Sequence, residues 1–591
     1  MFDKILIANR GEIAVRIIRT AREMGLQTVA VYSEIDRDAL HVRMADEAYL
    51  LGPAAPSQSY LNVPKLLDIA KRSGAQAVHP GYGFLAENAG FARDVISAGL
   101  VWIGPHPDAI DAMGDKVRAR QAMVKAGVPV VPGGTEAIAD AAGAREAAKQ
   151  YGLPLALKAS GGGGGKGLKV ARTLDEVESA LTTAQREAEA YFKNGTIYAE
   201  RYLENPKHVE LQILADKHGT VLHVGERDCS LQRRHQKLWE EAPATIPEKV
   251  RKGMREAGVR AAQAIGYDSV GTIECLVSGS EFYFLEMNTR IQVEHTVSEM
   301  ISGLDLIREQ IRVAAGEKLG YTQSAVEFRG HAIEGRVNAE DPSQNFRPAP
   351  GTVTTYREPA GLGVRIDSAA YPGFTVTPDY DSMIAKLVVW APTRDEAIAR
   401  LRRAIDEYAI GGVPTTLPLL RALCDHGPVR DASYGTATLE AFAAGLYAEA
   451  STGSAGPSTA PSTALTRAKD DDGGEGVIRV EVNDKLYRVR LVDLPVPQQR
   501  GASKAAAPPR MAHKKKAVAQ SGDDVVSPMH GAVVELGVKE GDAVESGQVI
   551  AVIEAMKMMN EIRAHKSGTA KTIHVKAGDT VEAASPLVSI A

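Results

Sequence analysis

Short apolar runs alternate with amphipathic patterns along most of the chain. The run KILIA at 4–8 is followed by Asn-Arg-Gly, then by Ile13 and Ile17 at helical spacing, and then by the apolar run QTVAVY at 27–32. A strand, a helix and a second strand in this order predict a βαβ unit and a parallel sheet. The alternation continues to about residue 447. We therefore expect an α/β fold over that length.

The pattern changes in the last quarter of the chain. Residues 449–475 are rich in Ser, Thr, Ala, Pro and Gly, and residues 494–524 are rich in Pro, Ala and Lys, which predicts two flexible linkers. Between them, GVIRVEVNDKLYRVRLVD at 476–493 alternates with period two around Asn-Asp, which predicts a β-hairpin. The last module covers residues 526–591.

That last module contains an internal repeat. The segment GAVVELGVKEGDAVE begins at Gly531, and the similar GTAKTIHVKAGDTVE begins 37 residues later, at Gly568. Two similar β halves predict a small sandwich with quasi-twofold symmetry, in which the Gly-Asp pairs form matching turns. The segment EAMKM lies between the halves, so Lys557 is predicted at an exposed hairpin tip between two methionines. An ordinary surface lysine is the alternative.

Composition limits the classes of function. A chain of 591 residues is expected to form about three to five domains. The net charge of −5 and the pI of about 6.3 give no electrostatic reason to expect nucleic acid or an anionic membrane as a partner. Three cysteines cannot build a disulfide framework at this size, and we find neither a targeting pattern nor a run of 18 apolar residues. We therefore expect a cytoplasmic protein.

Five consecutive glycines at 161–165 lie between two apolar runs in PLALKASGGGGGKGLKVAR. The stretch is not a Walker P-loop, because Ser160 stands where that pattern needs its first glycine. A glycine loop between two strands can still fold over phosphates, since bare N–H groups approach anions closely. A floppy linker is the alternative. Lys158 before the loop and Lys116 upstream could supply charge to a triphosphate, or could be surface lysines.

Two carboxylates are predicted to face each other in DSVGTIECLVSGSEFYFLEMNTRIQVEH. Residues 278–280, Ser-Gly-Ser, indicate a turn between two strands. If Val277 pairs with Tyr283, the same register pairs Glu274 with Glu286. Like charges in that position are destabilising unless a cation lies between them. Two carboxylates and a neighbouring amide oxygen suit a hard divalent cation such as Mg²⁺.

Polar residues continue beyond the second carboxylate with period two. One predicted strand face carries Glu286, Asn288, Arg290, Gln292 and Glu294, and the other carries Met287, Thr289, Ile291 and Val293. A solvated strand face is the alternative, but such faces usually carry interchangeable Lys, Thr and Ser. We therefore expect one functional wall with metal ligands, a guanidinium, an amide and a further carboxylate in order.

A basic cluster precedes these strands in ERDCSLQRRHQK. Its members are Arg227, Arg233, Arg234, His235 and Lys237. Because the whole chain is acidic, a small anion such as phosphate or bicarbonate fits this cluster better than nucleic acid. Arg336, on a short extended segment in HAIEGRVNAEDP, adds a further cation.

Several long motifs together resemble the biotin carboxylase domain of acyl-CoA carboxylases, an ATP-grasp enzyme. They are ILIANRGEIAVRIIR, HPGYGFLAEN, KASGGGGGKG, ERDCSLQRRHQK and EMNTRIQVEH. EAMKM resembles the biotin-attachment motif of carrier domains; a lipoyl domain, which has a similar fold, typically carries an acidic residue where Met556 stands. The first resemblance covers about 1–447 and the second about 526–591. The whole layout is similar to the α subunit of a bacterial acetyl- or propionyl-CoA carboxylase.

The resemblance implies an α/β protein followed by an all-β module. Its expected parts are a parallel-sheet N-terminal domain at 1–115, an ATP-grasp domain at 116–330, a carboxylase C-terminal α+β domain at 331–447, a linker with a hairpin at 448–525, and a biotinyl carrier sandwich at 526–591. Longer α subunits of this family have a sizeable partner-docking domain between carboxylase and carrier. Only the hairpin stands there in this chain, so the mode of partner docking is open.

The resemblance also implies roles for individual residues. The ATP-binding positions would be Lys116, Lys158, Gly163, Gly164, Gly165, Glu200, Leu203, His208 and His235. The ligands of Mg²⁺ or Mn²⁺, with two ions expected, would be Glu274, Glu286 and Asn288. Bicarbonate would meet Lys237, Arg290, Gln292 and Val293. Biotin would be attached to Lys557 and would bind at Tyr82 and Arg336. Glu294 would be the base, and the catalytic set would be Glu294, Arg290, Arg336 and Lys237.

The implied reaction is ATP- and bicarbonate-dependent carboxylation of biotin through carboxyphosphate. A separate carboxyltransferase β subunit, a biotin protein ligase and a second copy of the carboxylase part are the implied partners, and the acyl-CoA is left open. Two alternatives remain at this point: another ATP-grasp ligase that joins a carboxylate to an amine, and a scaffold with an inactive carboxylase. The carrier module speaks against the first, and the intact metal and base positions speak against the second.

Overall fold

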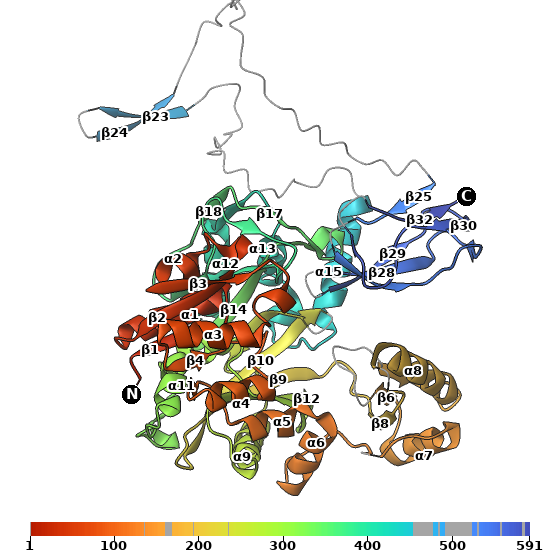
Figure 1. Ribbon diagram of the computed structural model, residues 1–591, viewed down its shortest axis with the longest axis horizontal. Coiled ribbons are helices and arrows are strands. Elements are labelled where there is room, and N and C mark those ends of the chain that lie inside the picture. Colours follow the sequence, from red (N-terminus) through yellow and green to blue (C-terminus); the bar gives the residue numbers. More distant parts are fainter. Residues whose placement is uncertain are drawn as a thin grey trace, which may run out of the picture. The chain divides into compact units, whose positions relative to one another are not determined.

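The computed structural model describes residues 2–134, 136–159, 168–192, 194–233, 236–452, 477–482, 485–490, 523–528, 531–555, 558–581 and 585–591. Contacts divide the chain into two units, Met1–Ser454 and Ala455–Ala591, and each is described by itself (Figure 1). No helix among the described residues is long and apolar enough to cross a membrane.

A parallel sheet opens the first unit, with its five strands in the order β3-β2-β1-β4-β5. The strands are β1 (Lys4–Ile7), β2 (Gln27–Ser33), β3 (Glu47–Gly52), β4 (Ala77–His79) and β5 (Val101–Trp102). Its helices are α1 (Gly11–Glu23), η1 (Glu34–Asp36), α2 (Leu40–Met44), η2 (Pro56–Gln58), α3 (Val63–Ser73), α4 (Ala89–Ser97) and α5 (Pro107–Gly114). The predicted βαβ unit is confirmed, because β1 and β2 pair in parallel and α1 connects them.

The loops after β1 and β4 meet at the carboxyl edge of this sheet. The side chain of Asn9 donates from Nδ2 to the backbone oxygen of Pro80 at 2.7 Å and to that of Tyr82 at 2.8 Å. Between them, Gly81 has a φ of +63°, and a Cβ there would lie 3.0 Å from the Asn9 amide nitrogen. Open α/β sheets bind ligands at this edge. The two loops thereby fix Tyr82 where a ligand would lie.

A small antiparallel sheet, β7-β6-β8, carries the residues on both sides of the glycine loop. Its elements are α6 (Lys116–Lys125), α7 (Ala141–Tyr151), β6 (Leu155–Ala159), β7 (Leu168–Ala171), α8 (Val177–Phe192) and β8 (Ile197–Arg201). Buried alanines on α7 and α8, such as Ala148 and Ala184, let both helices pack closely on the sheet. The predicted strands around the loop are confirmed, since Lys158 pairs with Leu168; the glycines themselves lie outside the described residues.

An antiparallel sheet of eight strands forms the centre of the first unit, in the order β13-β12-β9-β10-β11-β14-β21-β19. The strands are β9 (Lys207–Ala215), β10 (Val221–Arg233), β11 (Gln236–Ala242), β12 (Val270–Ser278), β13 (Glu281–Asn288), β14 (His331–Asn338), β19 (Val364–Ser368) and β21 (Met383–Ala391). The nearby helices are α9 (Glu248–Ala264), α10 (His295–Ser302), α11 (Leu306–Ala314) and α12 (Arg394–Glu407). The expected boundary at 330/331 falls inside this continuous sheet, directly before β14. The limits of the five expected parts stay predictions.

Short elements complete the first unit. They are η3 (Gln323–Ala325), β15 (Glu340–Asp341), η4 (Pro342–Gln344), β16 (Arg347–Pro348), β17 (Gly351–Thr352), β18 (Thr355–Arg357), β20 (Thr375–Val376), β22 (Ala409–Gly411), α13 (Leu417–Leu423), α14 (Gly427–Arg430) and α15 (Thr438–Thr452). The last helix continues past residue 447, where the carboxylase part was expected to end.

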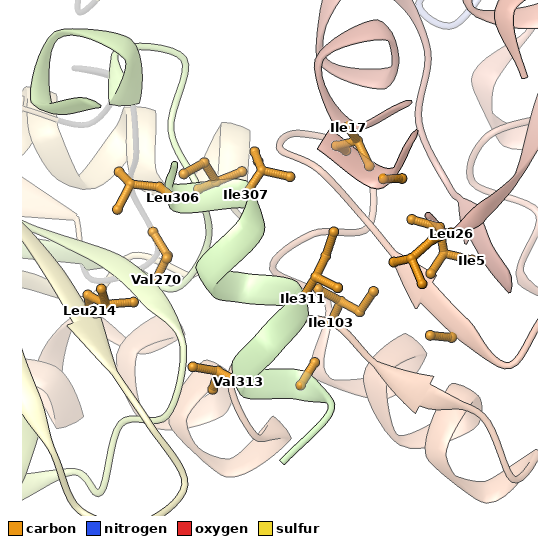
Figure 2. Close-up of a cluster of buried hydrophobic side chains, with 14 of the residues drawn as sticks. Ile5, Ile17, Leu26, Ile103, Leu214, Val270, Leu306, Ile307, Ile311 and Val313 are labelled. Carbon is orange, nitrogen blue, oxygen red and sulfur yellow. The ribbon is translucent and has the colours of Figure 1, made fainter. Parts of the chain in front are cut away.

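One apolar cluster joins the parallel sheet to the eight-stranded sheet (Figure 2). Helix α11 lies in its middle and contributes Leu306, Ile307 and Ile311, all fully buried. Ile5 comes from β1 of the parallel sheet, and Leu214 comes from β9 of the eight-stranded sheet. Burying such side chains contributes about 1.5–3 kcal/mol each. The helix therefore holds the edge that carries Tyr82 against the sheet that carries the charged residues described below.

The second unit contains the predicted hairpin and the predicted sandwich. The hairpin pairs β23 (Val477–Val482) with β24 (Lys485–Arg490). The sandwich has two four-stranded sheets, β25-β32-β30-β27 and β29-β28-β26-β31. Its strands are β25 (Asp524–Val526), β26 (Gly531–Leu536), β27 (Ala543–Val544), β28 (Val549–Ala555), β29 (Met558–Arg563), β30 (Gly568–Ile573), β31 (Thr580–Val581) and β32 (Pro586–Ile590). Both predictions are confirmed.

The predicted quasi-twofold symmetry is visible in the strand order. The positions that β26, β27 and β28 have in their sheets are taken in the opposite sheets by β30, β31 and β32, respectively. The turns match as well: Gly541 has a φ of +92° and Gly578 a φ of +95°. Asp542 Oδ2 accepts a hydrogen bond from the Lys539 backbone N–H at 2.8 Å, and Asp579 Oδ2 does the same in the second half. The repeat thus specifies two copies of one structural unit.

Candidate active site

The two carboxylates predicted to oppose each other do so. Glu274 on β12 pairs with Glu286 on β13. The register assumed at the turn was wrong, however, because Val277 pairs with Phe282 and not with Tyr283. The turn is tighter than expected, with Gly279 at a φ of +59°, and an irregularity between Glu274 and Cys275 shifts the pairing by one residue. Such a bulge re-aims side chains next to functional sites, and here it restores the opposition of the two carboxylates.

The polar wall is not one continuous strand, contrary to expectation. Strand β13 ends at Asn288, and the chain then turns into α10, which begins at His295 with Glu294 as its N-cap. Its polar side chains nevertheless converge, because Asn288 Nδ2 and Gln292 Nε2 donate to Glu274 Oε1 at 2.8 and 2.9 Å. The turn thus brings the amide of Gln292 to β12, the strand that pairs with β13.

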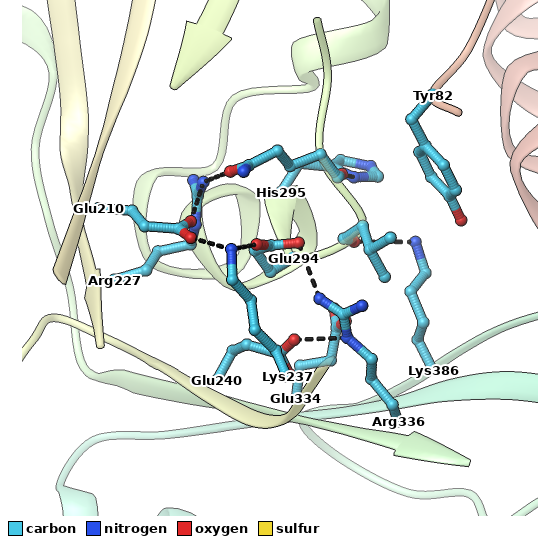
Figure 3. Close-up of polar contacts among 12 residues, drawn as sticks. Tyr82, Glu210, Arg227, Lys237, Glu240, Glu294, His295, Glu334, Arg336 and Lys386 are labelled. Carbon is cyan, nitrogen blue, oxygen red and sulfur yellow. Dashed lines mark hydrogen bonds and ion pairs between the residues drawn. The ribbon is translucent and has the colours of Figure 1, made fainter. Parts of the chain in front are cut away.

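An ammonium group lies at the centre of the site (Figure 3). Lys237 on β11 donates from Nζ to Glu294 Oε1 at 2.6 Å, to Glu274 Oε1 at 3.1 Å and to Glu210 Oε1. Burial by itself would lower the pKa of Lys237, but the three carboxylates outweigh it and raise the pKa well above its ordinary value. This lysine is therefore charged at neutral pH and holds three strands and the start of α10 together.

Glu294 connects this lysine to an arginine. Its Oε2 accepts a hydrogen bond from Arg336 Nη2 at 3.0 Å, and Arg336 Nε donates to Glu240 Oε1 at 2.5 Å. Burial would raise the pKa of Glu294, but Lys237 and Arg336 hold it below its ordinary value. Glu294 is therefore ionised at neutral pH. A carboxylate without its proton, held between two cations, is able to accept one from a bound ligand.

The basic cluster separates into different environments. Arg227 is fully buried and donates to Gln292 Oε1 at 2.6 Å and to Glu210 Oε2 at 2.9 Å, so it is a scaffold of the site and not the anion-binding group that we expected. Arg233 donates to Asn345 Oδ1 at 2.6 Å and lies over the ring of Phe346. Arg234 and His235 lie outside the described residues.

Histidine and carboxylate side chains gather around Glu274. His208 Nε2 lies 3.1 Å from Glu274 Oε2 and 3.3 Å from Glu210 Oε1. Burial would lower the pKa of His208, but these two carboxylates outweigh it and raise the pKa to about 9. The oxygen-rich set of Glu274, Glu286 and Asn288 fits a hard cation, because two carboxylates face each other across β12 and β13 and an amide contacts one of them. Glu274 is shared by Lys237, His208 and the amides of Asn288 and Gln292.

Arg290 lies at the edge between the two sheets. It donates from Nε to Glu87 Oε2 at 2.8 Å and from Nη2 to Asn288 Oδ1 at 2.6 Å. Val293, expected to bind bicarbonate, accepts a hydrogen bond at its carbonyl oxygen from Lys386 Nζ at 3.2 Å. Both residues therefore lie beside the charged cluster.

Tyr82 reaches this region from the parallel sheet, as Figure 3 shows. Its hydroxyl donates to Glu12 Oε1, and Glu12 Oε2 lies 3.2 Å from Lys386 Nζ. Lys386 Nζ also lies 3.6 Å from Asp367 Oδ2. Tyr82 and Arg336, which are 254 positions apart in sequence, thus stand on two sides of one polar region.

The expected nucleotide residues are only partly described. On neighbouring strands, Lys158 of β6 forms an ion pair with Glu200 of β8. Leu203 is half-buried just after β8. Lys116 begins α6, and the structure describes its backbone alone. The loop glycines Gly163–Gly165, His235 and Lys557 lie outside the described residues, so their roles stay predictions.

Among the contributors to the site that were not found in the sequence are Glu210, Glu240 and Glu87. Glu210 could have been, because His208, Glu210 and Gln212 alternate with apolar residues in HVELQILA at 208–215. Three polar residues at period two, all buried, indicate a strand face turned toward a site. Glu87 and Glu240 have no comparable signal, because their partners come from distant parts of the chain.

Comparisons with known proteins agree with this geometry. Four protein-family models match the chain: "Biotin carboxylase, N-terminal domain" at 1–110, "Carbamoyl-phosphate synthase L chain, ATP binding domain" at 115–322, "Biotin carboxylase C-terminal domain" at 334–441 and "Biotin-requiring enzyme" at 523–590. The biotin-dependent acyl-coenzyme A carboxylase alpha3 subunit of Mycobacterium leprae is 44% identical over 607 residues, which cover 99% of this chain and 98% of that protein. Biotin carboxylase 1 of Bacillus subtilis is 52% identical over 75% of this chain and 99% of its own length.

Solved structures resemble the first part of the chain. Biotin carboxylase from Campylobacter jejuni, in a β,γ-ATP complex, has a TM-score of 0.71 at 47% identity and covers 74% of this chain and 99% of its own. The biotin carboxylase domain dimer of Hydrogenobacter thermophilus 2-oxoglutarate carboxylase, with MgADP and bicarbonate, has a TM-score of 0.70 at 49% identity and covers 74% and 97%. The chain belongs to the biotin-dependent carboxylases, and it joins a biotin carboxylase, an ATP-dependent ligase, to a biotin carrier domain.

Proposed function

We propose that this chain is the α subunit of an acyl-CoA carboxylase. It carboxylates biotin attached to Lys557 at the expense of ATP and bicarbonate, and it passes the carboxyl group to acetyl-CoA or propionyl-CoA on a separate carboxyltransferase subunit. The full-length similarity to an acyl-coenzyme A carboxylase alpha3 subunit supports this assignment. Biotin protein ligase and a second copy of the carboxylase part are the further partners that we propose, the latter because a related domain is described as a dimer.

The observation that carries the proposal is one carboxylate shared by two cations. Glu294 accepts hydrogen bonds from Lys237 at one oxygen and from Arg336 at the other. We assign Lys237, Arg290, Gln292 and Val293 to bicarbonate binding. Glu294 removes the proton of bound bicarbonate, and Lys237 keeps the developing charge stabilised. Arg336 and Tyr82 then hold biotin next to the same position.

The triphosphate belongs on the other side of this cluster. We assign its phosphates to Lys116, Lys158 and Gly163–Gly165, and its base to Glu200 and Leu203, with His208 and His235 nearby. In-line phosphoryl transfer to bicarbonate yields carboxyphosphate and needs neutralised charge and a positioned nucleophile. Mg²⁺ or Mn²⁺, held by Glu274, Glu286 and Asn288, would supply that neutralisation when bound. The glycine loop would exclude water from the labile product.

ADP release tests the base and separates this proposal from its alternatives. Purified chain should release ADP with bicarbonate present, and free biotin should stimulate it. Glu294→Gln should lower the rate by about 10²–10⁴-fold. Glu281→Gln, on an exposed carboxyl at the start of β13, is the matched control and should leave the rate unchanged. A rate without any biotin effect would favour another ATP-grasp ligase, and no turnover at all would favour a scaffold.

The acyl-CoA and the delivery route need the partner. Labelled carboxyl transfer to acetyl-CoA and to propionyl-CoA, measured with the partner subunit, decides between the two substrates. We further propose that the linker at 494–524 lets the whole carrier domain travel between the two active sites, since about 30 flexible residues span roughly 30 Å. Deletion of residues 498–516 should spare carboxylation of free biotin and depress acyl-CoA carboxylation. Equal loss of both activities would contradict this route.

A further inference from the structure

A second pair of opposed carboxyl groups lies behind the site. Glu240 on β11 pairs directly with Glu334 on β14 in the antiparallel register. Directly opposed residues point to the same face of a sheet, with Cβ atoms about 4.5–5.5 Å apart. Both side chains are fully buried. Neither is among the residues that we assign to ATP, metal, bicarbonate or biotin, yet Figure 3 shows both next to Arg336.

Each carboxyl group has one satisfied oxygen and one orphaned oxygen. Glu240 Oε1 accepts from Arg336 Nε at 2.5 Å, and Glu334 Oε2 accepts from Thr296 Oγ1 on α10. Glu240 Oε2 and Glu334 Oε1 are buried and have no hydrogen-bond partner among the described residues. Buried carboxylate oxygens without partners cost several kcal/mol if both groups are ionised. One orphan on each member of a facing pair points to a single missing hydrogen.

The nearest cations do not resolve the pair. Lys386 on β21, the strand next to β14, lies against Glu12, Asp367 and the Val293 carbonyl. Lys237 lies against Glu210, Glu274 and Glu294. Of these three cations, Arg336 is the one that donates to the pair, at Glu240, and it also donates to Glu294. If both facing carboxyl groups were ionised, their two negative charges would therefore be balanced by a single guanidinium, which Glu294 also engages.

We propose that Glu240 and Glu334 hold one proton between their orphaned oxygens and act as a positioning dyad for Arg336. The proton lets the dyad carry one negative charge instead of two. Two carboxyl groups that share a site cannot both ionise. The pKa directions agree: burial and, less strongly, Glu294 raise the pKa of Glu240 to about 7 against the opposing charge of Arg336, and burial followed by Glu240 raises that of Glu334 well above its ordinary value.

The dyad has a consequence for the proposed reaction, and this part rests on the biotin site proposed at Arg336. When Glu294 takes the proton of bicarbonate, Arg336 loses one of its two charged partners. A dyad with a single charge then keeps Arg336 in place through Nε and balances its charge once, whereas two charges would leave the group of three net negative. The guanidinium remains able to stabilise negative charge on biotin. A doubly ionised pair would draw Arg336 away from biotin.

Two substitutions at one position test the dyad. Glu334→Leu removes the partner of Glu240 Oε2, so the KM for free biotin should rise about tenfold. Glu334→Gln can donate to Glu240 Oε2 in place of the shared proton, so it should raise that KM at most about threefold. An equal rise in both variants would overturn the proposal, because a role in packing alone gives the amide no advantage.

The pH profile supplies a readout that packing does not affect. The shared proton is bound at low pH and is lost as pH rises above neutral, so kcat/KM for biotin in the wild type should fall there. The groups that face the dyad are Arg336, Lys237, Lys386, Thr296 and Glu294, and all of them are unchanged in Glu334→Gln. An amide at position 334 cannot lose this proton. The fall should therefore vanish in Glu334→Gln. A fall that persists unchanged would overturn the proposal.

Infrared difference spectra detect the proton directly. The wild-type-minus-Glu334→Gln spectrum at neutral pH should contain the C=O stretch of one protonated carboxyl group, and a carboxylate band alone would overturn the proposal. Glu241→Gln is the matched control, because Glu241 is the next residue on β11, equally buried, and engaged by His331 and Arg394 instead. It should change neither the biotin KM nor the pH profile.

Arg336→Met separates the two proposals. If it leaves the biotin KM unchanged, the proposed biotin site is misplaced. If it raises the KM while neither Glu334 variant has an effect, the dyad alone is refuted.

Discussion

The carboxylase site and the carrier sandwich are built in opposite ways. The first unit buries ionisable side chains completely, among them Glu210, Arg227, Glu240 and Lys386. The sandwich core is aliphatic, and Ser527 is the one buried polar side chain among the described residues of the second unit. A buried ion pair contributes little net stability, but breaking it leaves an uncompensated charge. The first unit therefore keeps buried charges that add little stability, because its chemistry needs them. The carrier needs only a rigid and symmetric support for one lysine.

The largest expected effect is the loss of a buried cation. Arg227→Met should lower the free energy of unfolding of the first unit by about 3–5 kcal/mol, because it leaves Glu210 without one of its charged partners. The three tryptophans, Trp102, Trp239 and Trp390, all lie in that unit, so their fluorescence during urea unfolding reports it alone. Arg403→Met breaks an exposed pair with Glu407 on α12 and should cost less than about 0.5 kcal/mol. Equal losses would refute the contrast.

A cavity in the carrier core should lower the stability of the second unit only. Ile550→Ala removes a fully buried side chain from the sandwich and should destabilise it by about 2–5 kcal/mol. Amide hydrogen exchange of the second unit measures this loss, and the tryptophan transition should stay where it is. Val552→Ala, half-buried on the same strand, should cost less. A shift of the tryptophan transition would show that the units are not independent.

Acid should weaken the first unit through its buried carboxylates. Burial would raise the pKa of Glu241, but the hydrogen bond to His331 and the charge of Arg394 outweigh it and lower the pKa to about 2. Because this pKa is depressed, its contribution is present above the ordinary value near 4.5 and is lost as pH falls toward 2. The loss should be on the order of 3 kcal/mol. Urea unfolding across that range should show a flatter pH dependence in Glu241→Gln; an unchanged slope would count against the assignment.

The smallest effect tests the symmetry of the carrier. Asp542→Ala and Asp579→Ala each remove one side-chain hydrogen bond to a turn backbone N–H. Each should cost about 0.5–1.5 kcal/mol, and the two costs should agree. Hydrogen exchange of the second unit measures both. Clearly unequal losses would mean that the repeat in sequence is not a repeat in energetics.

The contrast between the two units also explains what could be predicted from the sequence. The carrier follows from a local repeat, and the pairing of Glu274 with Glu286 follows from one turn, although the assumed register was off by one residue and a bulge corrected it. The end of β13 at Asn288 was missed, because NTRIQVEH keeps its polar alternation through a turn without Gly or Pro.

Long-range neighbours carry no sequence signal. Arg336 contacts Glu240 and Glu294, which are 96 and 42 positions away. The order of strands in the eight-stranded sheet brings Glu240 to it, and the turn between β13 and α10 brings Glu294. The motif resemblance placed Arg336, Lys237 and Glu294 in one catalytic set, and in the structure Glu294 accepts hydrogen bonds from both cations. It could not indicate that Arg227 is a buried scaffold, because an arginine in a basic run has the same appearance whether it faces solvent or a carboxylate.

The central claim is that the cluster around Glu294 carboxylates biotin on Lys557 of the same kind of chain. The most direct measurement incubates the biotinylated protein with ATP and isotopically labelled bicarbonate, without acyl-CoA, and locates the label by peptide mass. We expect an ATP-dependent label of up to one group per chain on the peptide that contains Lys557, and no label in Glu294→Gln or in Lys557→Arg. An unlabelled wild type that is fully biotinylated, or an ATP-dependent label that survives in Lys557→Arg, would contradict it.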